Sequence, residues 1–213
     1  MISPATTAAA GPPDTDVPSA PPFAVRVTRW ILAAGGGIGL LAALTLTIEK
    51  INLLVDPGYR PSCSINPILS CGSVMTTPQA AAFGFPNPLI GVVGFSVVTT
   101  VGVLLLAGVR LPRWWWLGLQ AGATFGVVFV HWLIYQSLYR IGALCPYCMI
   151  VWVVTIAIFW YVSLYNLHHR HLPAPPGATV LVRLHTVGVT GWYIVILVLI
   201  GEQFWFYWRT LLA

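Results

Sequence analysis

Five long runs of apolar residues, each about as long as a bilayer is thick, constrain this chain more than any other feature. A transmembrane helix needs about 20 mostly apolar residues. Only 7% of the residues are charged, against about 25% in an ordinary soluble domain, which leaves too few charges to cover a soluble surface. The sequence therefore predicts an all-α integral membrane protein with five transmembrane helices, at about residues 30–54, 89–109, 114–139, 145–167 and 185–208.

The remaining segments are short and leave no room for a sizeable soluble domain. Residues 1–22 are rich in Pro, Ala and Thr, and they are predicted to form a disordered N-terminal tail. They lack the positive n-region of a signal peptide. Residues 23–213 are predicted to form one membrane bundle, a four-helix-bundle-like core plus one extra span. A cysteine loop and a half-helix are expected within 56–85, where the piece from Ile68 to Phe83 is too short and too polar to cross a membrane.

Small and polar residues inside the spans indicate how the helices pack. The glycine cluster at 35–39 predicts a close approach between helices. Gly118, Gly122 and Gly126 lie at four-residue spacing on one face, which predicts a packing stripe. His131 lies within the third span, where an ionisable residue is a functional candidate; a lone histidine also fits a hydrogen-bonded packing residue, and that interpretation is favoured.

The basic residues lie near the ends of the spans and form no patch, so they indicate topology and not a nucleic-acid surface. Glu49 and Lys50 lie near the far end of the first span, where snorkelling is expected. The positive-inside rule places the N-terminus inside and both cysteine pairs on the outer, oxidising face. This prediction rests on how the ten Lys and Arg residues are distributed between the two sides. The N-terminal side has six, Arg26, Arg29, Arg110, Arg113, Arg170 and Arg183, and the other side has four, Lys50, Arg60, Arg140 and Arg209.

Two close pairs of cysteines carry the chemistry. Cys145-Pro146-Tyr147-Cys148 stands where the fourth span begins. Two intervening residues bring the sulfurs within disulfide range, and proline suits the first helical turn because its missing N–H needs no partner there. The helix N-terminus favours a thiolate and lowers the pKa of a cysteine placed at it. The motif therefore predicts thiol–disulfide exchange.

Other roles for the cysteines have to be weighed against this one. Cys63 and Cys71 lie in a loop rich in glycine and proline, where a mobile exchanging pair and a simple stapling disulfide both fit. A bridge between Cys145 and Cys148 closes too short a loop to stabilise the fold much. A zinc site would favour a second Cys-x-x-Cys, which is missing. Haem attachment would need a histidine where Met149 stands. No metal is expected.

The order of these elements resembles the bacterial homologues of vitamin K epoxide reductase. The resemblance extends from Trp30 to about Leu167: a first span, the Cys63-(seven residues)-Cys71 loop, a half-helix, and a Cys-Pro-Tyr-Cys motif that opens the fourth span. The DsbB type of quinone-linked disulfide generator carries its two cysteine pairs in the reverse order.

The resemblance implies roles for the four cysteines. Cys63 and Cys71 would be the shuttle pair that oxidises a periplasmic, DsbA-like thioredoxin-fold protein. Cys145 would exchange with the shuttle pair, and Cys148 would face a membrane quinone, either menaquinone or ubiquinone. Since no fused thioredoxin-like domain follows the spans in this sequence, a separate partner protein is expected.

Further site residues follow from the same resemblance. Asn87, between two prolines, matches a family residue that hydrogen-bonds a quinone carbonyl, and it also fits a plain turn residue. Thr76 or Thr77 replaces a serine of the family. Trp152 stands near the quinone where animal enzymes often carry Tyr, so recognition of vitamin K epoxide itself is not expected. Arg140 fits either a charge that stabilises the Cys148 thiolate or an interfacial anchor.

These observations predict a membrane disulfide-forming oxidoreductase in the bacterial inner membrane, multi-pass, with a cytoplasmic N-terminus and extracytoplasmic cysteine pairs. Its expected partners are the DsbA-like protein, the quinone and the lipid bilayer. Two alternatives remain: a quinone or vitamin K epoxide reductase that uses a small thiol donor, and a non-catalytic membrane scaffold with two structural disulfides.

Overall fold

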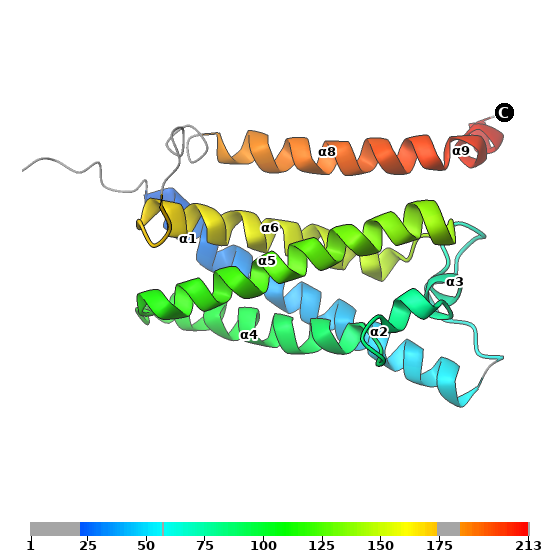
Figure 1. Ribbon diagram of the computed structural model, residues 1–213, viewed down its shortest axis with the longest axis horizontal. Coiled ribbons are helices and arrows are strands. Elements are labelled where there is room, and N and C mark those ends of the chain that lie inside the picture. Colours follow the sequence, from blue (N-terminus) through cyan, green and yellow to red (C-terminus); the bar gives the residue numbers. More distant parts are fainter. Residues whose placement is uncertain (1–21, 57, 174–183, 213) are drawn as a thin grey trace, which may run out of the picture.

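A computed structural model describes residues 22–56, 58–173 and 184–212 of the chain (Figure 1). Within these residues, five helices are long and apolar enough to cross a membrane, which confirms the predicted all-α membrane fold. The predicted disordered tail lies outside the described residues, apart from Pro22, where the first helix begins.

The first span is a continuous helical rod. It consists of α1 (Pro22–Trp30), the π-helical turn η1 (Ile31–Gly35) and α2 (Gly36–Val55). Two later spans begin with proline in the first turn, where its missing N–H costs nothing. The elements after α2 are α3 (Cys71–Met75), η2 (Pro78–Ala81), α4 (Pro88–Leu106), α5 (Arg113–Tyr135), η3 (Gln136–Ile141), α6 (Pro146–His168), α8 (His185–Gln203) and α9 (Trp205–Leu212).

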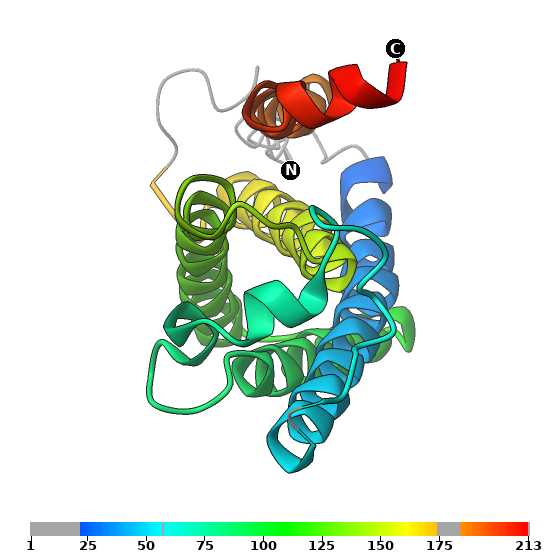
Figure 2. The same cartoon turned by 90° about the vertical axis from the view of Figure 1, so that its right-hand side faces the viewer.

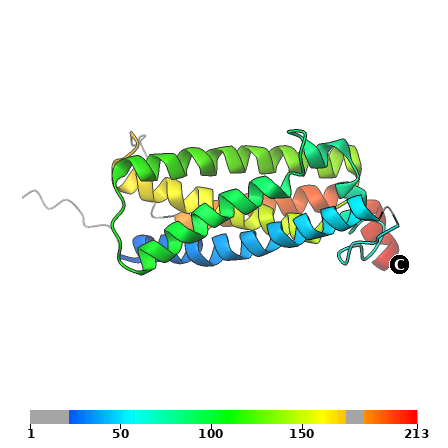
Figure 3. The ribbon, with the colours of Figure 1, turned by 90° about the horizontal axis from the view of Figure 1, so that it is seen from below.

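Four of the spans form a bundle that is open along one side. The helix α2 packs against α4 and α6, and α5 packs against α6, whereas α4 and α5 scarcely touch although they follow each other in the chain. Figure 3 shows α2, α4 and α5 running along the same long axis. Seen from the cysteine end, the four spans surround a central space, and α3 lies across its mouth (Figure 2).

The predicted close approach of the glycine cluster is confirmed where the first span meets α4. A Cβ added to Gly36 would lie 2.9 Å from the backbone nitrogen of Thr99, and one added to Gly102 would run into the backbone of Ala33. Without side chains at these positions the two helix backbones come close, as small residues permit in membrane bundles.

The fifth span, α8, lies outside the four-helix bundle (Figures 1 and 2). Polar contacts attach it. The Trp192 indole donates to Nε2 of His131 at 3.0 Å, and the Tyr193 hydroxyl donates to the Val153 carbonyl oxygen at 2.8 Å. His131 is therefore the hydrogen-bonded packing residue that the sequence favours.

The last span ends earlier than expected. The helix α8 stops at Gln203, and α9 begins at Trp205, so the predicted end near Trp208 is wrong. Phe204 lies between the two helices and is buried in a cluster with Ile68 and Leu144. Packing of this aromatic ring in the cluster favours the turn over a longer straight helix.

The segment before α4 is less helical than expected. The predicted helical piece from Ile68 to Phe83 is wrong in its extent, because only α3 and η2 form, separated by Thr76 and Thr77. Pro78 has no N–H to donate within a continuing helix, which explains the break. Just upstream of α3, Ser70 is extended, and Leu69 pairs with Leu144 in an isolated parallel bridge.

Candidate active site

The two cysteine pairs lie at the same end of the bundle, held there by a backbone bridge between their segments. The Ser70 N–H donates to the Leu144 carbonyl oxygen at 2.9 Å, and the Leu144 N–H donates to the Ile68 carbonyl oxygen at 2.7 Å. Cys71 follows Ser70, and Cys145 follows Leu144. The bridge therefore sets the loop cysteine beside the cysteine that opens α6.

Three sulfurs meet in the resulting cluster. Cys63 and Cys71 form a disulfide with their Cα atoms 5.6 Å apart, whereas Cys145 and Cys148 are free thiols. The Sγ atoms of Cys71 and Cys145 lie 2.9 Å apart, and both residues are fully buried. Cys63 is only 6% exposed. A thiol in contact with a disulfide sulfur is the arrangement that exchange requires.

The sulfur cluster also has the spacing of a metal site, because the Sγ atoms of Cys63, Cys71 and Cys145 lie within 4.8 Å of one another. Metal ligation needs thiolates. In the structure Cys63 and Cys71 are joined to each other, so only Cys145 offers a thiol in this group. The donor set fits exchange between sulfurs better than a metal ion.

Cys145 caps the N-terminus of α6, as the sequence predicts. The hydrogen bond from the Cys148 thiol lowers the pKa of Cys145, and the backbone N–H groups of Tyr147 and Cys148 act in the same direction. Burial and the charge of Glu49 oppose this shift. The pKa of Cys145 lies below the ordinary thiol value as a result, which increases its thiolate fraction for exchange.

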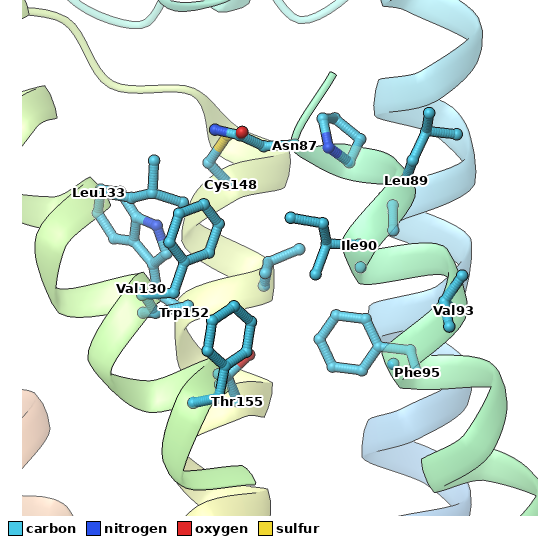
Figure 4. Close-up of a pocket in the computed structure, with 18 of the residues that line it drawn as sticks. Asn87, Leu89, Ile90, Val93, Phe95, Val130, Leu133, Cys148, Trp152 and Thr155 are labelled. Atoms are coloured by element: carbon cyan, nitrogen blue, oxygen red, sulfur yellow. The ribbon is translucent and has the colours of Figure 1, made fainter. Parts of the chain in front are cut away.

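Below the sulfurs, the bundle encloses an apolar cavity of about 760 Å³. Cys148 and Asn87 lie at one end of it, and Ile90 and Phe95 of α4 point across it toward α5 and α6, whereas Leu89 and Val93 lie on the other side of α4 (Figure 4). Drug-sized and cofactor-sized ligands occupy cavities of about 300–1,000 Å³ with mainly apolar walls and few polar groups. The cavity can therefore hold a ring-shaped apolar molecule against the Cys148 sulfur.

The glycines of α5 shape this cavity. Gly118 and Gly122 line it, and a Cβ added to either would meet nothing within 4 Å. The predicted packing stripe is wrong for these two residues, which leave space instead of filling a helix interface. Only Gly126 comes near another helix, since its added Cβ would lie 3.3 Å from the Thr155 side chain.

The other predicted site residues take different places. Asn87 is buried, and its amide bonds with backbone groups: Oδ1 accepts from the Ala82 N–H at 3.0 Å, and Nδ2 donates to the Gln79 carbonyl oxygen at 2.7 Å. Thr77 lines the cavity and donates to the Val74 carbonyl oxygen. Two further residues complete the set: Trp152 is buried in the cavity wall, and Arg140 is exposed in η3 and outside the lining.

A buried carboxylate beside the sulfur cluster has no role in the sequence prediction. Glu49 is 6% exposed, so the expected snorkelling is wrong for this residue. Its Oε1 accepts from the Ser62 hydroxyl at 2.5 Å. The neighbouring Lys50 instead donates to the Met75 carbonyl oxygen, at the end of α3, at 2.7 Å. A carboxylate within an apolar span is the sequence signal that identifies such a residue.

An apolar cavity, a free thiol at its end and a disulfide in contact with the paired thiol are the features expected of a membrane oxidoreductase. A sequence model of the vitamin K epoxide reductase family matches residues 30–163. This is more than half of the chain, which therefore belongs to that family. A comparison with curated proteins gives no match. The fifth span and α9 lie outside the matched region.

Proposed function

We propose that this protein reoxidises a DsbA-like thioredoxin-fold protein and passes the electrons through its two cysteine pairs to a membrane quinone. The observation that supports the proposal is that the cysteines follow one another from the loop to the cavity. The Cys63–Cys71 disulfide touches Cys145 at 2.9 Å, and Cys148, the partner of Cys145, lines the apolar cavity.

The outer steps exchange one disulfide for another. A thiolate of the reduced partner attacks the Cys63–Cys71 disulfide; the partner leaves oxidised, and both loop cysteines become thiols. Cys71 then attacks Cys145 of the inner disulfide, which forms a Cys71–Cys145 bond and releases Cys148. Cys63 attacks Cys71 in turn, restores the loop disulfide and releases Cys145. The contact between Cys71 and Cys145 supports this order, since attack requires the two sulfurs to be adjacent.

The inner step uses the cavity. Cys145 and Cys148 return to a disulfide by giving two electrons and two protons to the quinone, which becomes a quinol. The cavity walls are apolar and its volume of about 760 Å³ suits such a molecule. Asn87 uses one amide hydrogen on the Gln79 carbonyl oxygen. Its amide carries a second hydrogen, which would bind a quinone carbonyl.

We place the protein in the bacterial inner membrane with the N-terminus in the cytoplasm. The positive-inside bias of the sequence supports this orientation. The start of α1, the α4–α5 connection and the end of α6 all lie at the end of the bundle opposite the cysteines (Figure 1). The cysteine pairs would then face the extracytoplasmic side, where a DsbA-like partner works.

The scaffold alternative accounts less well for the site. A stapling disulfide needs no third sulfur in contact and no reactive thiol at a cavity. The structure has both, in Cys145 and Cys148.

The test is electron transfer in the full-length protein reconstituted in lipid discs with a soluble short-tailed quinone. A reduced thioredoxin-fold partner is added, and quinone reduction is followed by absorbance. Cys148→Ala should abolish the reaction, while the neighbouring Met149→Leu, which conserves volume, should keep it. Full quinone reduction by Cys148→Ala would contradict the relay. A parallel assay with a small dithiol in place of the partner separates the two possible electron donors.

A further inference from the structure

The buried carboxylate of Glu49 sits where the cysteine loop meets the bundle. It lies one helical turn after Leu46, which belongs to the same buried cluster as Cys63, Cys71 and Cys145. Oε1 accepts from the Ser62 hydroxyl at 2.5 Å and from the Ser62 N–H at 3.3 Å. The Tyr59 side chain also interacts with the carboxylate. All of these donors come from the loop segment just before Cys63.

Burial makes these contacts strong. A buried carboxylate costs much free energy unless hydrogen bonds compensate it. The neighbouring Lys50 directs its ammonium group to the Met75 carbonyl oxygen instead. Among the described residues, Oε2 has no close hydrogen-bond partner, so the contacts of Oε1 with Ser62 carry most of the compensation. Hydrogen bonds to an ionised group are about twice as strong as neutral ones.

The cysteine loop has two limbs, the segment before Cys63 and the segment after it, and different contacts hold each limb in place. The limb after Cys63 is fixed by the Leu69–Leu144 bridge and by Asn66, whose Oδ1 accepts from the Ile68 and Leu69 N–H groups. The limb before Cys63 is held to the bundle through Ser62 and Glu49. Because Cys63 is only 6% exposed, a protein partner cannot reach its sulfur while this limb is held.

We propose that Glu49 is a positioning residue for Cys63: its carboxylate holds Ser62, and thereby Cys63, against the bundle, and it must release Ser62 before a partner protein can reach the loop disulfide. The closed loop keeps Cys63 beside Cys71, ready for the inward exchange. In the open loop Ser62 has left Glu49, and the sulfur of Cys63, still bonded to Cys71, becomes accessible to the partner while the Leu69–Leu144 bridge keeps Cys71 in place. This inference rests on the proposed function for its partner, but the loop motion can be measured without it.

The first test measures how easily the loop disulfide is reached. In the Cys145→Ser, Cys148→Ser background the loop disulfide remains and the relay is absent. A thioredoxin-fold reductant is added, and free loop thiols are counted over time by maleimide mass shift. Ser62→Ala and Glu49→Ala should speed reduction by at least about tenfold, the change expected when a charge-assisted hydrogen bond is lost. Glu49→Gln, which keeps an acceptor without the charge, should lie between.

The matched control is Asp56→Asn. Asp56 is an exposed residue of the same loop whose carboxylate accepts from the nearby Gly58 N–H and not from Ser62, so its variant should leave the reduction rate unchanged. Thermal unfolding of every variant establishes that it is folded. Equal reduction rates in the folded Glu49→Gln and Ser62→Ala variants and in their parent would overturn the proposal.

A second measurement separates positioning from general destabilisation. In the chain with all four cysteines, Glu49→Gln should lower the KM for the partner, because Cys63 is easier to reach. It should also lower kcat, because Cys63 is held less often beside Cys71. A merely structural loss would reduce the active fraction and leave KM unchanged, which would contradict the positioning role. If the chain reduces no quinone at all, the proposed function fails, while the first test still reports on Glu49.

Discussion

At the scale of single residues, the four cysteines have different surroundings, and the proposed relay gives them different tasks. Cys71 and Cys145 are fully buried and touch each other. Cys63 is nearly buried but belongs to the limb that Glu49 holds. Cys148 lines the cavity. The proposed order of exchange, from Cys63 and Cys71 to Cys145 and Cys148, follows these positions.

Cross-linking of selected cysteine pairs tests this order of exchange. The variant Cys63→Ser, Cys148→Ser retains only Cys71 and Cys145, whose sulfurs lie 2.9 Å apart, and mild oxidation should join them completely. The control Cys71→Ser, Cys148→Ser retains Cys63 and Cys145 and should cross-link at least about tenfold more slowly, since exchange and bond formation depend on access. Non-reducing peptide mass spectrometry measures both. Equal cross-linking rates would mean that Cys71 is no better placed than Cys63 to react with Cys145.

A second prediction at this scale concerns Asn87. Asn87→Ala would leave the Ala82 N–H and the Gln79 carbonyl oxygen without their partners. Both hydrogen bonds are part-buried, and a typical intramolecular hydrogen bond contributes about 0.5–1.5 kcal/mol, so the melting temperature should fall in a thermal unfolding assay. Gln79→Ala is the control, because the contact uses only its backbone oxygen. An unchanged melting temperature in Asn87→Ala would mean that these hydrogen bonds contribute nothing to the fold.

At the scale of elements, the backbone bridge just before α3 is what brings the two cysteine pairs together. The parallel pairing of Leu69 with Leu144 joins two segments 75 residues apart in the chain. The sequence predicts a loop and a half-helix here, and the cysteine spacing indicates an exchanging pair. It cannot predict the bridge, because a single pair of backbone hydrogen bonds leaves no periodic pattern in the residues.

The attachment of α8 allows a prediction for an element outside the family match. His131→Phe would leave the Trp192 indole N–H without its acceptor. Such interhelical hydrogen bonds are worth about 0.6 kcal/mol on average in a membrane protein, so stability should fall slightly. Quinone reduction should remain unchanged, because neither residue lines the cavity.

A double-mutant cycle checks this attachment. Trp192→Phe and His131→Phe both remove the hydrogen bond between the two side chains, so the loss of stability in the double variant should be smaller than the sum of the two single losses. Fully additive losses, measured by thermal unfolding, would mean that the two side chains do not interact.

At the scale of the whole molecule, the opening between α4 and α5 governs the cavity. Packing of α4 on α2 and of α5 on α6 builds two halves that meet through α2 and α6. The glycines of α5 leave the space between the halves empty.

Filling this space tests whether the cavity is the quinone site. Gly122→Leu adds four carbon atoms where a Cβ meets nothing within 4 Å. It should raise the KM for a long-tailed quinone by roughly tenfold or more, since the side chain takes up ligand volume. Gly191→Leu on α8 is the control, because Gly191 is equally unobstructed but lies outside the cavity. Reduction of the loop disulfide by the partner should be normal in both. An unchanged KM in Gly122→Leu would place the quinone elsewhere.

Much of the fold follows from the sequence because length and hydropathy decide it: a long apolar run must be a helix in a membrane. The spacing and order of the four cysteines in the sequence likewise predict that they belong to the candidate site. Other features depend on contacts between distant segments. Whether Gly118 faces a helix or a cavity is decided by how α4 is placed, and whether Glu49 reaches water or Ser62 is decided by the path of the loop. Local patterns carry no information on either.

The gap between α4 and α5 has a consequence for how the reaction is supplied. Leu89, Val93 and Phe125 line the cavity and are also exposed on the outside of the bundle, so in a membrane the cavity would border the hydrocarbon layer. A quinone would then arrive by diffusion in two dimensions, and its quinol would leave without crossing water. The relevant supply is its mole fraction among the lipids, so diluting a fixed amount of quinone with more lipid should slow turnover even when the aqueous volume stays the same.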